Sequence, residues 1–264
     1  MILKYGEIIF KSSISVVYEA TYGGRKYVVK IPSSKNTCTN EYKVLKMVNG
    51  VGGCIQVLKL IRPYPNKDLL GLVFCNYKFD SRVLNTKSDL FLDPTFFRKF
   101  TRTILQTVKK VHDKGIVHCD IKPSNIFVGS NNTPILADFG SCAEIENGVY
   151  DKYRTTEQYR DPTRIVSTTS LIDGKNDVYS LGCLLYFYFT KRELFTLMIW
   201  SSGKRDVLRN RKLTPGRILL SRRRGSKFSH KDVYMLQGLI NKMTVFSKFN
   251  RISLVECLKH GFYS

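Results

Sequence analysis

Long apolar runs are missing from this 264-residue sequence. The most apolar stretch, residues 181–189, is too short to cross a bilayer and ends at Thr190-Lys191-Arg192-Glu193. The first seven residues lack the basic segment and the apolar run of a secretion signal. We therefore expect neither a transmembrane segment nor a signal peptide, and a location in the cytoplasm, the nucleus or both.

Paired cysteine motifs are also missing. The seven cysteines are scattered, odd in number and never spaced as C-x-x-C, and the four histidines do not join them at the spacing of zinc ligands. These absences argue against a disulfide framework and a structural zinc site. Free thiols in a reducing compartment are the expected state.

Acidic residues are few: 21 Asp and Glu stand against 43 Lys and Arg, which gives a formal net charge of +22. A field of this sign attracts nucleic acids, anionic membrane surfaces or acidic protein segments without deciding among them. The densest basic region is residues 204–231, which includes Arg222-Arg223-Arg224. Because base-stacking aromatic residues are not interleaved there, a solvated surface is favoured, and nucleic-acid binding stays open as an alternative.

The hydrophobic residues that are present, 43% of the chain, form a strand-rich first part and a helix-rich second part. Short β-like runs separated by turn signals are expected at 8–10, 15–20, 26–31, 56–61 and 69–74, with one helix around Glu41. Helices are expected at 94–113, 180–189, 234–243 and 253–260. This order predicts an α+β fold of two lobes within one domain, residues 1–264. The lobes would be residues 1–75 and 80–264, joined by a connecting segment at 75–79.

Nine residues in the middle of the chain carry the most specific chemical pattern. Val117-His118-Cys119-Asp120-Ile121-Lys122-Pro123-Ser124-Asn125 holds a carboxylate, a lysine two positions later and an amide five positions later. Asp138-Phe139-Gly140 places another carboxylate 18 residues after the first. Phosphoryl transfer from a metal-bound nucleotide needs a carboxylate to orient the attacking hydroxyl, a cation near the moving phosphoryl group and oxygen ligands for Mg²⁺.

The nine-residue segment resembles the catalytic loop of eukaryotic-type protein kinases, and Asp138-Phe139-Gly140 resembles their metal-binding motif. The resemblance covers nearly the whole chain, from about residue 5 to residue 262. It implies a bilobal kinase-like fold that uses ATP and Mg²⁺. Asp120 would be the catalytic carboxylate, and Lys122 would neutralise the transferring phosphoryl group. Asn125 and Asp138 would be the metal ligands.

The resemblance also implies a nucleotide site in the first lobe. Val28-Val29-Lys30 resembles the strand whose lysine holds the α- and β-phosphates, and Glu41 would be the partner carboxylate of Lys30 at the start of a helix. Only 11 residues separate the two, which is a short link for this family. Val17 aligns with the valine that follows the family's glycine-rich loop, so Val17 and Val28 are expected at the nucleotide.

Further positions would support the site. His118 and Phe139 resemble members of a stacked hydrophobic spine, and Thr156 matches a threonine that bridges the catalytic carboxylate and lysine in serine/threonine-specific members. Asp177 resembles a buried aspartate that holds the backbone of the catalytic loop. Arg251 matches an arginine whose usual glutamate partner is replaced here by Thr163, and we expect Asp161 to substitute for it.

Two departures from the family pattern have consequences. Phe10, Ser12 and Ser15 stand where three glycines are expected in the loop that covers the nucleotide, which predicts weaker or differently posed ATP binding, with Ser12 and Ser15 small enough to contact phosphate. Cys119 replaces the arginine that receives activation-loop phosphate, so control by that phosphate is not expected. A redox role for Cys119 and Cys142 is a second idea, but inert thiols are favoured.

The leading interpretation is an active serine/threonine protein kinase, with protein substrates that are acidic or associated with nucleic acid. A pseudokinase that uses the cleft as a scaffold or allosteric module is the alternative, and a nucleic-acid-binding protein with a kinase fold is a third. A chain this compact, with no separate regulatory domain expected, suits a large DNA virus as well as a cell. The pattern leaves open the substrate sequence, the activator and the oligomeric state.

Overall fold

The computed structural model describes residues 3–63, 69–76, 80–87, 89–144, 156–166, 171–194, 220 and 225–264. The connecting segment expected at 75–79 lies largely outside these residues, as do most of the basic region 204–231 and the residues just before Thr156. Among the described residues, no helix combines the length and the apolar character needed to cross a membrane.

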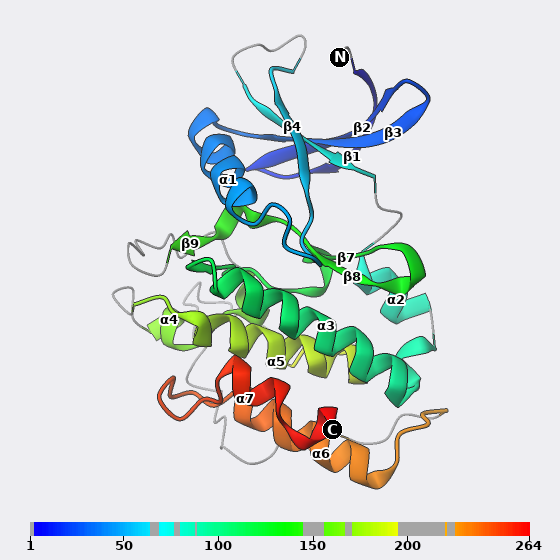
Figure 1. Ribbon diagram of the computed structural model, residues 1–264, viewed down its shortest axis with the longest axis vertical. Helices are drawn as coiled ribbons and strands as arrows, with labels where there is room; N and C mark the ends of the chain where they lie inside the picture. Colours follow the sequence, from blue (N-terminus) through cyan, green and yellow to red (C-terminus); the bar gives the residue numbers. More distant parts are fainter. Residues whose placement is uncertain are drawn as a thin grey trace, which may run out of the picture.

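The first lobe is a five-stranded antiparallel sheet with one helix against it (Figure 1). The sheet order is β1-β2-β3-β5-β4, and its strands are β1 (Lys4–Lys11), β2 (Ser15–Tyr22), β3 (Arg25–Pro32), β4 (Val57–Ile61) and β5 (Gly71–Cys75). Gly23 and Gly24 both have positive φ, 55° and 73°, and form the two-residue turn that joins β2 to β3. Such a turn matches the twist of paired strands and favours glycine. All five expected strands are confirmed.

The helix of this lobe is α1 (Lys35–Met47), which begins five residues before the expected start at Asn40. Ser34 caps it, because the Ser34 hydroxyl accepts a hydrogen bond from the backbone N–H of Thr37 at 3.1 Å. Cys38, Glu41 and Leu45 are buried and recur at helical spacing, so one face of α1 lies against the core. The early start explains the short link between Lys30 and Glu41, because only Ser33 and Ser34 separate β3 from α1.

The second lobe is mainly helical. Its α-helices are α2 (Ser81–Lys87), α3 (Pro94–His112), α4 (Thr163–Val166), α5 (Gly174–Thr190), α6 (His230–Met243) and α7 (Leu254–Leu258). The short strands are β6 (Ile116–Val117), β7 (Ile126–Val128), β8 (Pro134–Leu136) and β9 (Ala143–Glu144). The short 3₁₀ helices that the argument uses are η1 (Leu90–Leu92), η2 (Pro123–Asn125), η4 (Phe139–Ser141) and η7 (Gly261–Tyr263).

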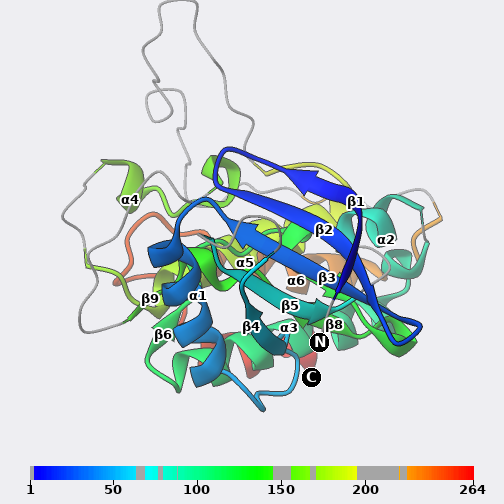
Figure 2. The same cartoon turned by 90° about the horizontal axis from the view of Figure 1, so that it is seen from above.

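The two central helices of this lobe differ in how well the sequence predicted them. The apolar stripe of α3 is buried as expected, from Phe97 to Val111. The expected helix at 180–189 begins earlier, at Gly174, because Asp173 and Asn176 form a reciprocal capping box. Since α5 is buried around most of its surface, its periodicity is weak and its first two turns carry polar residues that the apolar pattern missed. Seen from above, the sheet of the first lobe lies over these helices (Figure 2).

Candidate active site

Two short strand pairs bring the two motif segments together. β6 pairs with β9, with Val117 opposite Ala143, and β7 pairs with β8. The backbone N–H of Ala137 donates to the carbonyl of Asn125 at 2.9 Å. The catalytic-loop segment and Asp138-Phe139-Gly140 therefore run side by side between the two lobes, although 18 residues separate Asp120 from Asp138.

Asp177 on α5 holds the backbone of the catalytic loop through hydrogen bonds. This carboxylate is fully buried and accepts the backbone N–H groups of His118 and Cys119 at 2.8 and 2.9 Å, and it pairs with Nε2 of His112 at 2.8 Å. Burial by itself would raise the pKa of Asp177, but the His112 bond and the other donors lower it, so the carboxylate stays ionised. The predicted role of Asp177 is confirmed.

The bond to Asp177 holds an unusual backbone conformation. Cys119 has φ 68°, and Asp138 has φ 62°, in the left-handed region that residues other than glycine seldom adopt. Such conformations persist where surrounding contacts enforce them, and they concentrate at functional sites. Here both residues lie within the two motif segments.

Asp120 is the centre of a hydrogen-bond network. Its carboxylate accepts from the amide nitrogen of Asn125 at 3.0 Å and from the backbone N–H of Thr156 at 3.0 Å, and it pairs with Nζ of Lys122 at 2.7 Å. Lys122 also donates to the hydroxyl of Thr156 at 2.6 Å. Thr156 thus bridges the carboxylate and the lysine, as predicted. The network fixes the rotamer of Asp120 with its carboxylate 5% exposed.

Lys30 joins the two lobes at the cleft. Its ammonium lies 2.8 Å from Oε1 of Glu41 and 2.6 Å from Oδ1 of Asp138. Burial alone would lower the pKa of Lys30 and raise that of Asp138. Their attraction outweighs it, raising the Lys30 pKa and lowering the Asp138 pKa to about 2. A Cβ at Gly140 would come within 3.3–3.5 Å of all three groups, so glycine leaves the ion pairs room.

Asn125 and Asp138, the expected metal ligands, each keep an oxygen for a cation. The amide nitrogen of Asn125 uses both hydrogens on Asp120, on its carbonyl and on its carboxylate. This fixes the amide orientation and leaves the amide oxygen of Asn125 for a cation. Asp138 is 42% exposed at its side chain and offers its second oxygen. Two hard oxygen donors suit Mg²⁺, which commonly takes few protein ligands and completes its shell with water and phosphate oxygens. The residues fit the metal.

The stacked pair expected in the spine is present. His118 is fully buried, and its ring lies 5.0 Å from the ring of Phe139, edge to face. Nε2 of His118 is also 3.1 Å from the carbonyl oxygen of Ala137. Both side chains therefore serve packing and orientation, in agreement with the structural role predicted for them.

The sheet register places the first residues of β2, which follow the β1–β2 loop, beside the part of β3 that carries Lys30. Val17 lies opposite Lys30 in the β2–β3 pair, and Val28 is two residues before Lys30 on the same strand. Phe10 is 56% exposed, whereas Ser15 is buried. The hydroxyl of Ser12 bonds within the turn itself, to residues 14 and 15.

Arg251 forms an ion pair with Asp161, the substitute partner that the sequence suggested. Its guanidinium, fully buried, lies 2.5 Å from Oδ2 of Asp161 and also donates to backbone carbonyls of Lys175, Val245 and Phe246. Every hydrogen-bonding side of the guanidinium is thereby used. The prediction that Asp161 replaces the missing glutamate at Thr163 is confirmed.

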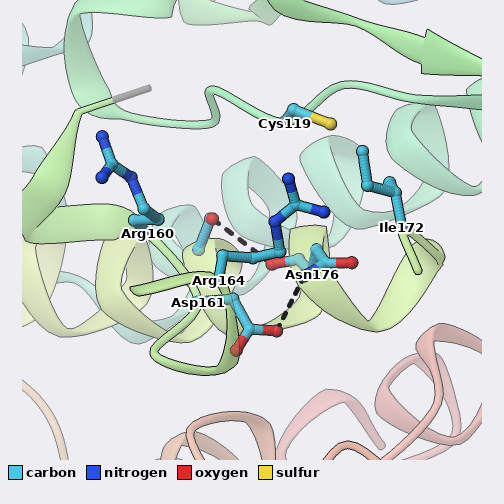
Figure 3. Close-up of a pocket in the computed structure, with 7 residues that line it drawn as sticks. Cys119, Arg160, Asp161, Arg164, Ile172 and Asn176 are labelled. Atoms are coloured by element: carbon cyan, nitrogen blue, oxygen red, sulfur yellow. Dashed lines mark hydrogen bonds between the residues drawn. The ribbon is translucent and has the colours of Figure 1, made fainter. Parts of the chain in front are cut away.

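A small pocket lies behind the catalytic loop (Figure 3). Its volume is about 20 Å³, enough for roughly one water molecule, and it sits between Cys119, α4 and α5. The lining residues are Cys119, Arg160, Asp161, Arg164, Ile172, Asn176 and Ser180. Arg164 extends from α4 toward Cys119, so the space next to Cys119 carries positive charge from another part of the chain.

The thiols at this site are expected to be unreactive. All seven cysteines are free, and burial raises the pKa of Cys119 and of Cys142 well above the ordinary value, whereas Cys75 is exposed. Iodoacetamide at pH 7.5 should modify Cys75 first and leave Cys119 and Cys142 intact for about a hundredfold longer, because the thiolate is the reactive form. Peptide mass spectrometry measures the order, with reaction in urea as the control that labels all seven. Early modification of Cys119 would support a redox role instead.

Sequence reasoning missed a buried link from α2 to the catalytic loop. The hydroxyl of Ser81 donates to the carbonyl of Pro123 at 2.7 Å, and the hydroxyl of Tyr188 donates to Ser81 at 2.7 Å. His112, which pairs with Asp177, was missed as well. No motif marks Ser81 or Tyr188, and the only sequence signal for His112 was its position at the end of a strongly amphipathic helix.

Comparison with known proteins agrees with this geometry. The sequence model of the protein kinase domain matches residues 7–263. A Dictyostelium discoideum protein described as "Probable serine/threonine-protein kinase glkA" is 31% identical over 183 residues, which is 68% of this chain and 38% of that protein. Mitogen-activated protein kinase HOG1 of Blumeria graminis is 29% identical over 65% of this chain and 52% of its own length. Cyclin-dependent kinase 7 of D. discoideum is 26% identical over 79% and 62%.

The chain thus spans between about two fifths and three fifths of the length of these relatives. The domain match extends over almost every residue and includes both lobes and the two motif segments. It agrees with the five-stranded sheet and the helical second lobe. The chain belongs to the protein kinase domain family.

Proposed function

We propose that this protein transfers the γ-phosphoryl group of ATP to serine and threonine hydroxyls of protein substrates, with Mg²⁺ as the metal. The observation that carries the proposal is the network in which Lys122 and Thr156 bond to each other and both bond to Asp120. A carboxylate with a lysine beside it suits an attacking hydroxyl and a developing phosphoryl charge.

Each residue of the site has its own role in the proposed phosphoryl transfer. Asp120 orients the substrate hydroxyl and accepts its proton as the oxygen bonds to phosphorus and the bond to the leaving ADP oxygen breaks. Lys122 offsets the charge on the moving group. Asn125 and Asp138 would hold Mg²⁺, which when bound neutralises charge between the phosphates. Lys30, kept in place by Glu41, would contact the α- and β-phosphates.

The remaining expected nucleotide contacts follow from the sheet. Val17 and Val28 flank Lys30 on β2 and β3 and would pack on the nucleotide base, while Ser12 in the β1–β2 turn and Ser15 at the start of β2 would lie nearest the phosphates. The pseudokinase alternative is less favoured, because the side chains required for transfer are all of the right type and are held at bonding distances around the cleft.

Control by activation-loop phosphate through position 119 is not part of this proposal. Cys119 offers no cation there, and its backbone is already fixed by Asp177. The backbone N–H groups of His118 and Cys119 both donate to Asp177, so the catalytic loop is held from within the fold. We infer that activity is constitutive or is controlled elsewhere.

The charge of +22 favours partners that are acidic or bound to nucleic acid. We propose acidic protein substrates in the cytoplasm or nucleus. Direct binding of nucleic acid is a second candidate that rests on the same charge, and a steep loss of affinity with rising salt would reveal it.

The proposed function is tested by phosphate incorporation from labelled ATP. The purified protein with Mg²⁺ should label serine and threonine in a generic protein substrate, and Lys30→Met should lower the rate about a hundredfold, because the phosphates lose their positioned cation. Lys109→Met, which removes an exposed lysine on α3, is the matched control and should match the parent. Equal incorporation by Lys30→Met, or label on tyrosine alone, would contradict the proposal.

A further inference from the structure

The turn between β1 and β2 is closed by its own side chain. The hydroxyl of Ser12 accepts the backbone N–H groups of Ile14 at 3.3 Å and Ser15 at 3.2 Å. The backbone N–H of Ser12 in turn donates to the carbonyl of Ser15 at 2.9 Å, and the Ser12 hydroxyl lies 3.3 Å from the same carbonyl. The Ser12 hydroxyl therefore satisfies the amides of Ile14 and Ser15.

A second contact braces the same tip from outside. The backbone N–H of Ser33 donates to the carbonyl of Ile14 at 2.9 Å. Ser33 lies in the two-residue connection between β3 and α1, directly before Ser34, which caps α1. The short connection thus holds the loop tip against the element that presents Glu41, and the turn does not depend on glycine for its shape.

The position of this turn gives the bonds a functional meaning. Val17 is paired with Lys30, and Ser15 is two residues nearer the tip on the same strand. Backbone N–H groups at such a tip are suited to donate to phosphate oxygens, which is why glycine-rich turns serve as anion sites. In this chain the Ser12 hydroxyl already fills the role of that oxygen.

We propose that Ser12 sets how much the phosphates contribute to nucleotide binding. The inference rests on the proposed function and deepens it. With the amides of Ile14 and Ser15 bonded to Ser12, a phosphate gains little by replacing one acceptor with another. Lys30 and the metal then supply most of the phosphate recognition, and the base and ribose carry a larger share of the affinity than in a loop with free amides.

The experiment compares nucleotides that differ only in their phosphates. Calorimetric titration measures Kd for ATP, ADP and adenosine with Mg²⁺ in the parent protein and in Ser12→Ala. The variant frees two amides, and a hydrogen bond to a charged phosphate corresponds to about tenfold in affinity. We expect Kd for ATP and ADP to fall about tenfold and Kd for adenosine to stay within about twofold.

Two matched variants distinguish the effect of losing the Ser12 hydroxyl from the effect of any other change in the turn. Ser13→Ala changes an exposed neighbour in the same turn, and Ser12→Thr keeps the hydroxyl. Both should bind all three nucleotides as the parent does, and thermal melting checks that every variant is folded. If Ser12→Ala fails to fold, Ser12→Gly replaces it, with the same expected gain for ATP.

The outcomes separate this inference from the function itself. Unchanged or weaker ATP binding by the folded Ser12→Ala protein would overturn the role of Ser12 and leave the kinase proposal standing. An equal gain for adenosine would also overturn it, because the phosphates would not be the cause. Absence of nucleotide binding by every variant would overturn both proposals together.

Discussion

Asp120→Asn is expected to lower kcat about a thousandfold while the protein stays folded and still binds nucleotide. Positioned general bases contribute between about a hundredfold and ten-thousandfold, and an amide cannot take the hydroxyl proton at neutral pH. Asn has the size of Asp and can still accept from the backbone N–H of Thr156, but its NH2 replaces the oxygen that accepts from Asn125 and Lys122, so thermal melting must show that the variant is folded. Steady-state phosphorylation kinetics with saturating ATP measure the effect.

Asp113→Asn is the control for the loss of one negative charge in this basic protein. Asp113 caps the C-terminal end of α3, and its exposed carboxylate lies 2.8 Å from Nζ of Lys109. We expect kcat within about twofold of the parent, since exposed pairs have small effects. An Asp120→Asn protein that keeps more than about a tenth of the parent's kcat would show that Asp120 is not the base.

Asp161→Ala is expected to cost about 3–5 kcal/mol of unfolding free energy, the range for leaving a buried charge without its partner. The guanidinium of Arg251 is fully buried and has Asp161 as its anionic partner, and Asp161 also accepts from the side chain of Asn176 at 2.9 Å. Urea unfolding followed by circular dichroism gives the free energy. The control Asp113→Ala breaks an exposed ion pair and should cost less than about 1 kcal/mol.

A double-mutant cycle then identifies the unpaired charge as the cause. Arg251→Met removes the cation, so the double variant Asp161→Ala with Arg251→Met should be less destabilised than the sum of the two single variants, by about 2 kcal/mol. Simple additivity would contradict the argument, because it would mean that the two side chains act independently although their atoms are 2.5 Å apart.

The sequence predicted the parts of this molecule that rest on local pattern or on motif. The five strands, the buried face of α3 and the partner choice of Arg251 follow from alternation, helical spacing and the cost of a lone buried charge. The roles of Asp177 and Thr156 came from the resemblance, and the bonds of both to the catalytic loop bear them out. The metal-ligand role of Asn125 stays a prediction.

Hydrogen bonds from serine hydroxyls to backbone groups were beyond the sequence. The bond from Ser81 to the carbonyl of Pro123 depends on a helix, α2, that is only seven residues long and has little periodicity. The self-bonding of Ser12 depends on a turn geometry that the aligned serines did not reveal. In both cases the role of the serine depends on the folded geometry around its hydroxyl, which the residue type alone does not indicate.

The ion pairs of Lys30 have a mechanical consequence. Lys30 and Glu41 both belong to the first lobe, on β3 and α1, whereas Asp138 belongs to the segment that leads to β9, which pairs with β6 beside the catalytic loop held by α5. Rotation of one lobe against the other would therefore stretch the 2.6 Å contact of Lys30 with Asp138 and leave its 2.8 Å contact with Glu41 unchanged. The distance from Lys30 to Asp138, compared with the distance from Lys30 to Glu41, would therefore report how far the two lobes have separated.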